Sequence, residues 1–258
     1  MKENLTILLQ DNNPKNYHLG LLLLVGNPHW LDDGIKQIIR QQLLIPSDSF
    51  LIQSSSPYNG QKVLEIARLG LAPLLLEELR QIDLSYCTNF EGLEQLPQLT
   101  EVRFYKNQLQ ELPVSLFKLP NLEHLYIRLN PQLNFETVCE ELCQFPNLKG
   151  LYLENNALRN VPTNLQRLQQ LQHLYLNNRQ LRHRNNIRII PNFLTNMPCL
   201  KSLTFKDNII ESFPPQLLDF ARRQLNLFNI GRHQFSSGHL AVEYMRLFKE
   251  HGLILEIH

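Results

Sequence analysis

The sequence predicts an α/β fold: a solenoid, or horseshoe, of stacked repeats with a curved parallel β-sheet on its concave face and helical, 3-10 or extended segments on its convex face. Two observations predict it. Leucine occupies 53 of the 258 positions, about a fifth of the chain, whereas glycine occupies only 10. The leucines also recur in one spaced motif whose copies begin 20 to 29 residues apart. A leucine excess at a regular period indicates one repeated leucine-based unit and argues against a nucleotide-binding α/β enzyme.

The repeated motif is L-x-x-L-x-L-x-x-N, in which the middle apolar positions alternate with polar ones. Clear copies begin at Leu99, Leu122, Leu148 and Leu200, and looser copies begin at Leu79, Leu171 and Leu225. Alternation at a period of two residues predicts a strand with one face inward and one outward. A second signature, an apolar residue followed by Pro and then by apolar residues at three-residue steps, starts at Leu112, Val161, Ile190 and Phe213.

The two linked signatures resemble the leucine-rich repeat family, in its 23-residue subclass with the pattern LxxLxLxxNxLxxLPxxLxxLxx found in bacterial and intracellular proteins. The resemblance covers residues 79–233. It implies a non-enzymatic scaffold for protein-protein interaction that binds a protein or peptide on its concave face. The Asn of each motif is expected to turn inward and to satisfy buried backbone groups of the bend. Arg179 stands at this position in one repeat, so we expect an interrupted row of asparagines and an irregular bend there.

The chain divides into three predicted parts. Residues 79–233 are the core repeats, residues 1–78 an N-terminal cap with helix-bearing degenerate repeats, and residues 234–258 a C-terminal helix and capping strand. In the first part, Leu19, Leu22, Leu24 and Asn27 satisfy the strand motif, and residues 50–52 are a candidate next strand. Helices are predicted over residues 32–44 and 60–79, while residues 2–11 fit a helix or a strand. Both an extension of the solenoid and a separate βαβ-like cap explain this part.

Composition and motifs exclude several classes of function. Lys and Arg number 25 against 24 Asp and Glu, so no global field attracts nucleic acid or an anionic membrane. The longest apolar run, residues 19–25, is far shorter than the ~20 residues of a membrane span, and no secretory signal is visible. We find no phosphate-binding, nucleophile or metal motif, and expect no cofactor, no metal and no enzymatic activity.

The cysteines are scattered and form no C-x-x-C pair. They are Cys87, Cys139, Cys143 and Cys199. Cysteines scattered in this way usually serve as small buried hydrophobic residues, and they stay unpaired in a reducing compartment. A cytoplasmic location is therefore expected.

The leucine register determines which residues face outward from the strands. Tyrosine occupies the middle outward position on three successive strands, and Tyr and Arg are enriched in binding hot spots. The predicted partner-binding surface comprises Arg103, Tyr105, His124, Tyr126, Arg128, Tyr152, Glu154, His173 and Tyr175. A purely structural row of tyrosines is the alternative, since cross-strand aromatic pairs stabilise a sheet by about 0.2–1 kcal/mol each.

Gly150 lies between His124 and His173 on this surface, where the missing side chain predicts a dent. The two histidines are two strands apart, about 9–10 Å. Two ligands at that separation make a poor metal site.

One repeat carries a basic insertion. The stretch from Leu181 to Pro191 is six residues longer than the matching stretch from Leu109 to Pro113. Its arginines are Arg179, Arg182, Arg184 and Arg188. Insertions in solenoids often lie on the binding face, so these residues are candidates to bind an acidic partner, with a solvated basic loop as the alternative.

Two further functions stay open from the sequence. An exposed strand edge over residues 253–257 would serve self-association, although we expect a monomer. The tyrosine row is also compatible with recognition of a small ligand or carbohydrate.

Overall fold

The computed structural model describes residues 2–11, 13–43, 58–178 and 182–230. It consists of two compact units: unit 1 (Met1–Phe104 and Pro113–Leu122) and unit 2 (Tyr105–Leu112 and Glu123–His258). The strand expected over residues 50–52 and the helix and strand expected within residues 234–258 lie outside the described residues. They stay predictions, as does the three-part division of the chain.

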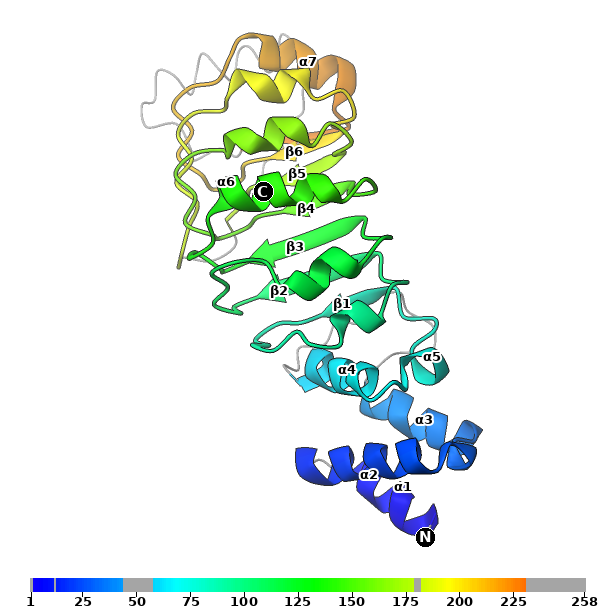
Figure 1. The fold of residues 1–258 in the computed structure, drawn as a ribbon. Helices are drawn as coiled ribbons and strands as arrows, with labels where there is room; N and C mark the ends of the chain where they lie inside the picture. The colour runs from blue at the N-terminus through cyan, green and yellow to red at the C-terminus, as the bar shows by residue number, and fades with distance from the viewer. Residues whose placement is uncertain (1, 12, 44–57, 179–181, 231–258) are drawn as a thin grey trace. The chain divides into compact units, whose positions relative to one another are not determined.

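Helices make up the N-terminal part of unit 1 (Figure 1). They are α1 (Lys2–Gln10), α2 (Pro14–Gly26), η1 (Pro28–Trp30), α3 (Asp33–Gln42), α4 (Tyr58–Arg68) and α5 (Ala72–Leu75). Side chains that cap the first turn mark the beginning of two of these helices. The Asn13 side chain accepts the N–H of Lys15, with Pro14 at the first helical position, and the Asp32 carboxylate accepts the N–H of Ile35.

The residues that match the strand motif near the N-terminus are helical, which corrects the sequence interpretation. Leu19, Leu22 and Leu24 lie in α2, and Asn27 ends it, its amide donating to the Leu23 carbonyl. Leucines three residues apart fit one face of a helix as well as the strand motif, and Leu is a strong helix former. The helix predicted over residues 32–44 is confirmed as α3. The one predicted over residues 60–79 is α4 and α5 with a break between them.

Two parallel strands begin the repeats of unit 1. They are β1 (Gln81–Asp83) and β2 (Glu101–Tyr105), whose last residue falls in unit 2. Ile82 pairs in register with Val102, and both are buried. The short helices η2 (Leu93–Gln95) and η3 (Val114–Lys118) follow the strands. Leucines at the predicted inward positions therefore form the core of this unit.

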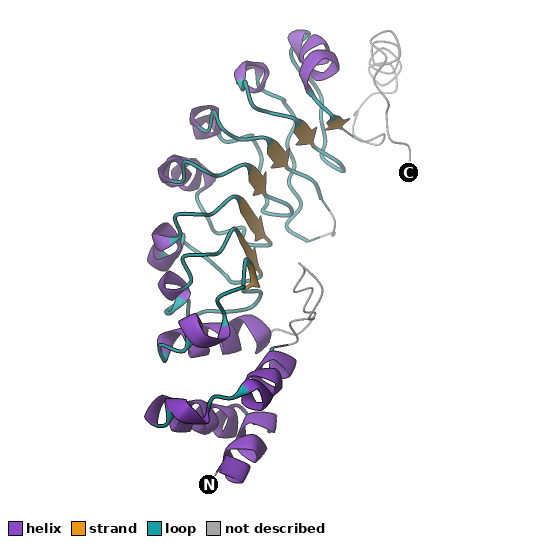
Figure 2. Ribbon diagram, turned by 90° about the vertical axis from the view of Figure 1, so that its right-hand side faces the viewer, coloured by secondary structure: helices purple, strands orange, loops and turns teal. Residues whose placement is uncertain are grey.

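Within the described residues, unit 2 has four strands that are each followed by a helical segment, and a fifth strand, β7, after them. Its strands are β3 (His124–Arg128), β4 (Gly150–Tyr152), β5 (His173–Tyr175), β6 (Ser202–Thr204) and β7 (Leu227–Asn229). Its helices are α6 (Phe135–Glu141), η4 (Leu142–Gln144), η5 (Thr163–Arg167), η6 (Asn192–Asn196) and α7 (Gln216–Gln224). Strands lie on one side of the unit and helices on the other (Figure 2). We call the outward side of β3–β7 the strand face.

The predicted register of unit 2 is confirmed. Neighbouring strands are parallel and follow the order of the sequence. Residues paired in register along the inward side are Leu125, Leu151, Leu174, Leu203 and Phe228, all buried. Because one inward residue per strand repeats across the stack, each repeat buries apolar surface that it could not bury alone. Among the described residues, the helices are too short or too polar to cross a membrane.

A carboxylate joins two repeats on the helical side of unit 2. Glu136, in the first turn of α6, accepts the N–H groups of Thr163 at 2.7 Å and Asn164 at 2.9 Å. The Thr163 hydroxyl also donates to it at 3.0 Å. Burial acts to raise the pKa of this carboxyl, but the hydrogen bonds from Asn164 and Thr163 together hold it below its ordinary value.

Replacing Gly60 with alanine should destabilise the protein, although alanine is the better helix former. A Cβ there would overlap the carbonyl oxygen of Asp83 in β1. The position of the Cβ is set by the backbone of α4 and the oxygen belongs to the backbone of β1, so no side chain can rotate away to relieve the overlap. We expect a loss of about 1–3 kcal/mol in the free energy of unfolding, measured by urea denaturation.

Gly34 in α3 is the matched control for this substitution. A Cβ there meets only the Asp32 side chain, at an ordinary 3.4 Å, so Gly34→Ala should leave stability unchanged or raise it by up to about 1 kcal/mol. Equal effects of the two substitutions would contradict the close packing of α4 on β1.

Candidate functional site

Three tyrosines stack side by side on the strand face, where the sequence predicts them. Tyr126 pairs in register with Tyr152, and Tyr152 with Tyr175. The first two rings stack with centroids 3.9 Å apart and planes 6° apart, and the next two with centroids 4.9 Å and planes 27° apart. The Tyr152 ring therefore has a tyrosine on each of its two faces, and we call the three residues the tyrosine ladder.

His124 fills the space beside Gly150, so the predicted dent is absent. A Cβ on Gly150 would overlap Nδ1 of His124 and lie 2.9 Å from Cε2 of Tyr152. The His124 ring stacks on the His173 ring, with centroids 6.2 Å apart. The two rings, expected about 9–10 Å apart from strand spacing, therefore lean toward one another over the glycine.

The surroundings of His173 disfavour its protonated form. Its Nδ1 lies 3.1 Å from the Ser202 hydroxyl, and the residue is partly buried. Burial, then the neighbouring His124 and Lys201, lower the pKa of His173 below its ordinary value. No group of three His, Cys, Asp or Glu side chains in the described part of the chain is placed to hold a metal ion.

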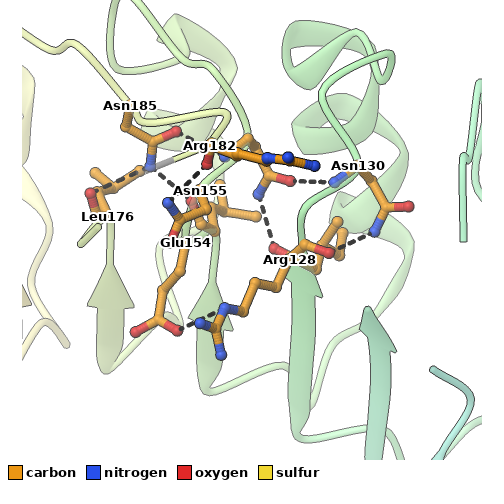
Figure 3. Close-up of polar contacts among 10 residues, drawn as sticks. Arg128, Asn130, Glu154, Asn155, Leu176, Arg182 and Asn185 are labelled. Carbon is orange, nitrogen blue, oxygen red and sulfur yellow. Dashed lines mark hydrogen bonds and ion pairs between the residues drawn. The ribbon is translucent and has the colours of Figure 1, made fainter. Parts of the chain in front are cut away.

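Arg128 and Glu154 lie together at the ends of β3 and β4 (Figure 3). Nε of Arg128 is 3.9 Å from Oε2 of Glu154. The Glu154 side chain is only 8% exposed and that of Arg128 25%, so the expectation that Glu154 faces solvent is wrong. A carboxylate is buried here because a cation lies beside it. Two cations lie over the Tyr105 ring in a cation–π arrangement. The guanidinium carbon of Arg128 is 5.3 Å from the ring centroid, and Nζ of Lys106 is 5.2 Å from it.

Several other predicted surface positions differ from expectation. Arg103 belongs to unit 1, where its Nη2 pairs with Oε1 of Glu101 at 2.6 Å. The alternation of the motif also assigns outward positions to Ser202, Thr204 and Asn229 on β6 and β7, but these residues are buried. Short side chains are covered by longer neighbours, which the pattern of the motif does not reveal.

A row of buried asparagines runs through the bends that follow the strands of unit 2. The Asn130 side-chain oxygen accepts the N–H of Asn107 at 3.0 Å, and that of Asn156 accepts the N–H of Asn130 at 2.8 Å. Their amides donate to carbonyls of the same region, Asn130 to Arg128 and Asn156 to Ile127. Each side chain therefore satisfies a buried backbone N–H of the preceding repeat. We call this row the asparagine ladder.

The asparagine ladder continues through Asn185, so the expectation of an interruption at the arginine is wrong (Figure 3). The Asn185 side-chain oxygen accepts the N–H groups of Asn156 at 2.9 Å and Leu158 at 3.0 Å. Its amide donates to the carbonyls of Leu153 and Leu176. The next member, Asn208, accepts the N–H of Ile187 at 3.2 Å.

The sequence contained the signal for Asn185. The insertion precedes the ladder position instead of following it, which moves the asparagine from position 179 to position 185. Four of the ladder asparagines stand six residues before a proline, as the pairs 107 and 113, 156 and 162, 185 and 191, and 208 and 214 show, and Asn130 is the exception. Aligning the repeats on their prolines would have found it.

Parallel strands with inward leucines and a continuous asparagine ladder at the bends are the defining features of one architecture. The protein has the leucine-rich repeat fold. No protein-family model matches the chain, and no curated protein matches it.

Among solved structures, this leucine-rich repeat chain is similar to an internalin from Listeria monocytogenes, with 18% identity over 68% of this chain and 46% of that one (TM-score 0.45). It is similar to the human trophoblast glycoprotein 5T4, with 19% identity over 67% and 66% of the two chains (TM-score 0.48). A leucine-rich repeat protein from Leptospira interrogans matches with 19% identity over 79% and 60% (TM-score 0.41). The chain spans 46% and 58% of the two internalins that it matches. At such identities and TM-scores, the likeness carries no function over to this chain.

The described part of the inserted loop, from residue 182 onward, contacts the repeats on both sides of it. The Arg182 carbonyl accepts from the Asn155 amide at 3.1 Å, and Nη2 of Arg184 donates to the Asp207 carbonyl at 3.2 Å. Arg188 forms an ion pair with Glu211. All three arginines are exposed. Arg179, the fourth candidate, lies outside the described residues.

Asn185→Ala should destabilise unit 2. It leaves the N–H groups of Asn156 and Leu158 buried without acceptors, and we expect a loss of about 3 kcal/mol in the free energy of unfolding by urea denaturation. Asn186→Ala is the matched control, because the Asn186 side chain is exposed; it should change stability by less than about 0.5 kcal/mol. Equal losses would show that Asn185 is not part of the ladder.

His173 should make stability depend on pH. Because its pKa is lower in the folded state, the unfolded chain binds this proton first. The stability that goes with neutral His173 is therefore present above the ordinary histidine pKa of about 6.5. It is lost as the pH falls below that value, toward the lowered pKa of the folded state. His173→Gln should flatten this part of the curve of melting temperature against pH, and Lys201→Gln should make it shallower. A curve unchanged by His173→Gln would contradict the assignment.

Proposed function

We propose that this leucine-rich repeat protein is a non-enzymatic interaction scaffold whose strand face, the predicted concave face, binds a protein or peptide partner. The observation that carries the proposal is the tyrosine ladder, Tyr126, Tyr152 and Tyr175. Tyrosine offers a large amphipathic area with few rotatable bonds, which makes it a frequent anchor in binding surfaces.

The tyrosine ladder is ordered in advance of binding. Stacking fixes each ring against the next, and the His124 ring packed over Gly150 supports Tyr152 from the side. A partner therefore meets side chains whose rotamers are already restricted, which lowers the entropy lost on association. Arg128 and the cation-flanked Tyr105 add polar groups at the border of the surface.

The stacking favours a protein or peptide partner over a carbohydrate. A sugar ring usually packs on an open aromatic face, but both faces of Tyr152 are occupied by its neighbours. The tyrosine hydroxyls suit hydrogen bonds with a polypeptide. A glycan array that stays negative at high protein concentration would agree with this choice.

Self-association is the second candidate for a binding function. Its proposed edge, residues 253–257, lies outside the described residues. Light scattering over a range of concentrations separates the two candidates, since we expect a monomer throughout.

A cytoplasmic location completes the proposal. All four cysteines are free thiols, and burial, with a smaller effect of Asp83, raises the pKa of Cys87 to about 11. Unpaired thiols of this kind suit a reducing compartment.

Replacing Tyr126, Tyr152 and Tyr175 together with alanine should abolish partner capture. The measurement is affinity capture from a native lysate, quantified by mass spectrometry, and we expect bound partners to fall by at least roughly tenfold. The matched control is Gln166→Ala, Arg167→Ala and Gln169→Ala, three exposed residues of the helical side, which should capture like the wild type.

A triple Tyr→Phe variant separates recognition from structure. It keeps the stacked rings, so circular dichroism and melting temperature should stay close to the wild type, while loss of the three hydroxyls should weaken capture. If both tyrosine variants remain folded and capture the same partners as the wild type, the strand face is not the binding surface.

A further inference from the structure

The described part of the inserted loop carries two exposed arginines next to buried residues. Arg182 and Arg184 are exposed, but Asn185 and Ile187 immediately after them are fully buried. Asn185 belongs to the asparagine ladder, and the Ile187 N–H and carbonyl bond to Asn208 and Ile209 of the next repeat. Residues 185–187 are thus anchored in unit 2, directly after the two arginines.

Within the described residues, Arg184 differs from Arg188 in the kind of partner that it contacts. Arg188 has a carboxylate partner in Glu211. In contrast, Arg184 donates to the main-chain carbonyl of Asp207, which orients the guanidinium without cancelling its charge. With a net charge of only +1 on the whole chain, this stretch concentrates positive charge in one place.

Exposed aliphatic side chains lie on the two segments that Arg184 joins by its bond to the Asp207 carbonyl. Ile189 is 58% exposed and Ile209 38%, and they are the large exposed hydrophobic residues in the described part of unit 2. The two segments run next to each other, since the Ile209 N–H donates to the Ile187 carbonyl and Ile189 forms a parallel bridge with Ser212. Apolar exposure and positive charge therefore coincide at one edge, which we call the loop edge: Arg182, Arg184, Ile189 and Ile209.

We propose that the loop edge binds an acidic peptide segment that carries aliphatic side chains. Carboxylates of such a segment suit the planar guanidinium groups, which bind them with two hydrogen bonds, and its aliphatic side chains bury the two isoleucines. This inference rests on the proposed function and names the chemistry of the partner.

The same observations disfavour a nucleic acid as the partner. A phosphate backbone gives the exposed Ile189 and Ile209 side chains nothing to pack against. Single-stranded nucleic acids also bind by stacking bases on open aromatic rings, and the Tyr152 faces are covered.

The test uses the full chain and fluorescence anisotropy. The probes are a fluorescein-labelled peptide in which Glu alternates with Leu, the same peptide with Gln for Glu, and a labelled oligothymidylate. We expect the wild type to bind the acidic peptide, more weakly as salt rises from about 0.05 to about 0.15 M. It should bind the Gln peptide and the oligothymidylate at least roughly tenfold less tightly.

Two variants examine the two parts of the loop edge. Arg182→Glu with Arg184→Glu should weaken binding of the acidic peptide by at least roughly tenfold. Its control is Lys118→Glu with Arg222→Glu, the same charge change at exposed positions on helices. Ile189→Gln with Ile209→Gln should weaken binding without altering its salt dependence, and Val114→Gln, at another exposed aliphatic position, is its control.

Three outcomes would overturn the inference: no binding of the acidic peptide, equal loss in the loop-edge variants and their controls, or tighter binding of the oligothymidylate. The capture experiment with the tyrosine variants reports separately on the strand face. If capture depends on the tyrosines while the acidic peptide fails to bind, the proposed function stands and only the loop-edge inference fails.

Discussion

The bends that follow the strands carry backbone N–H groups into the interior, where water cannot reach them, and the rest of the fold depends on satisfying those groups. Side chains of asparagine do this in unit 2, each serving the repeat before it. The inward leucines supply most of the favourable free energy by burial, but they do not fix the direction of the chain at each bend. The asparagines do, and strands that leave the bends in a fixed direction bring Tyr126, Tyr152 and Tyr175 into stacking contact.

A single glycine has a comparable effect on the strand face. Gly150 lets the His124 ring lie across β4 and reach toward His173, so that two aromatic clusters, one of tyrosines and one of histidines, share the same strands. Any larger residue at that position would displace the His124 ring and remove the lateral support of Tyr152. The strand face is therefore set by packing among its own side chains as much as by the sheet beneath them.

Much of this could be predicted from the sequence, and the failures have physical causes. The period of the leucines determined the fold, the register of the strands and the neighbouring tyrosines, because inward and outward positions alternate strictly along a strand. The leucine pattern does not predict which outward side chains become buried, because that depends on their length and on their ion-pair partners. Glu154 is buried because Arg128 lies beside it, and Thr204 because it is short. Leu19, Leu22 and Leu24 fit a helical face and a strand motif equally well, so the motif alone could not show that these residues form the helix α2. The ladder position of Asn185 was missed because the insertion was placed after the bend instead of before it.

The place of the insertion separates two properties that are usually coupled in a folded chain. Residues added ahead of Asn185 lengthen the loop, while the asparagine and everything after it keep the spacing of an ordinary repeat up to Pro191. The number and chemistry of the inserted side chains can thus vary without a shift in the stack that supports them. Evolution, or an engineer, can alter the reach and charge of this segment as an independent module on an unchanged framework.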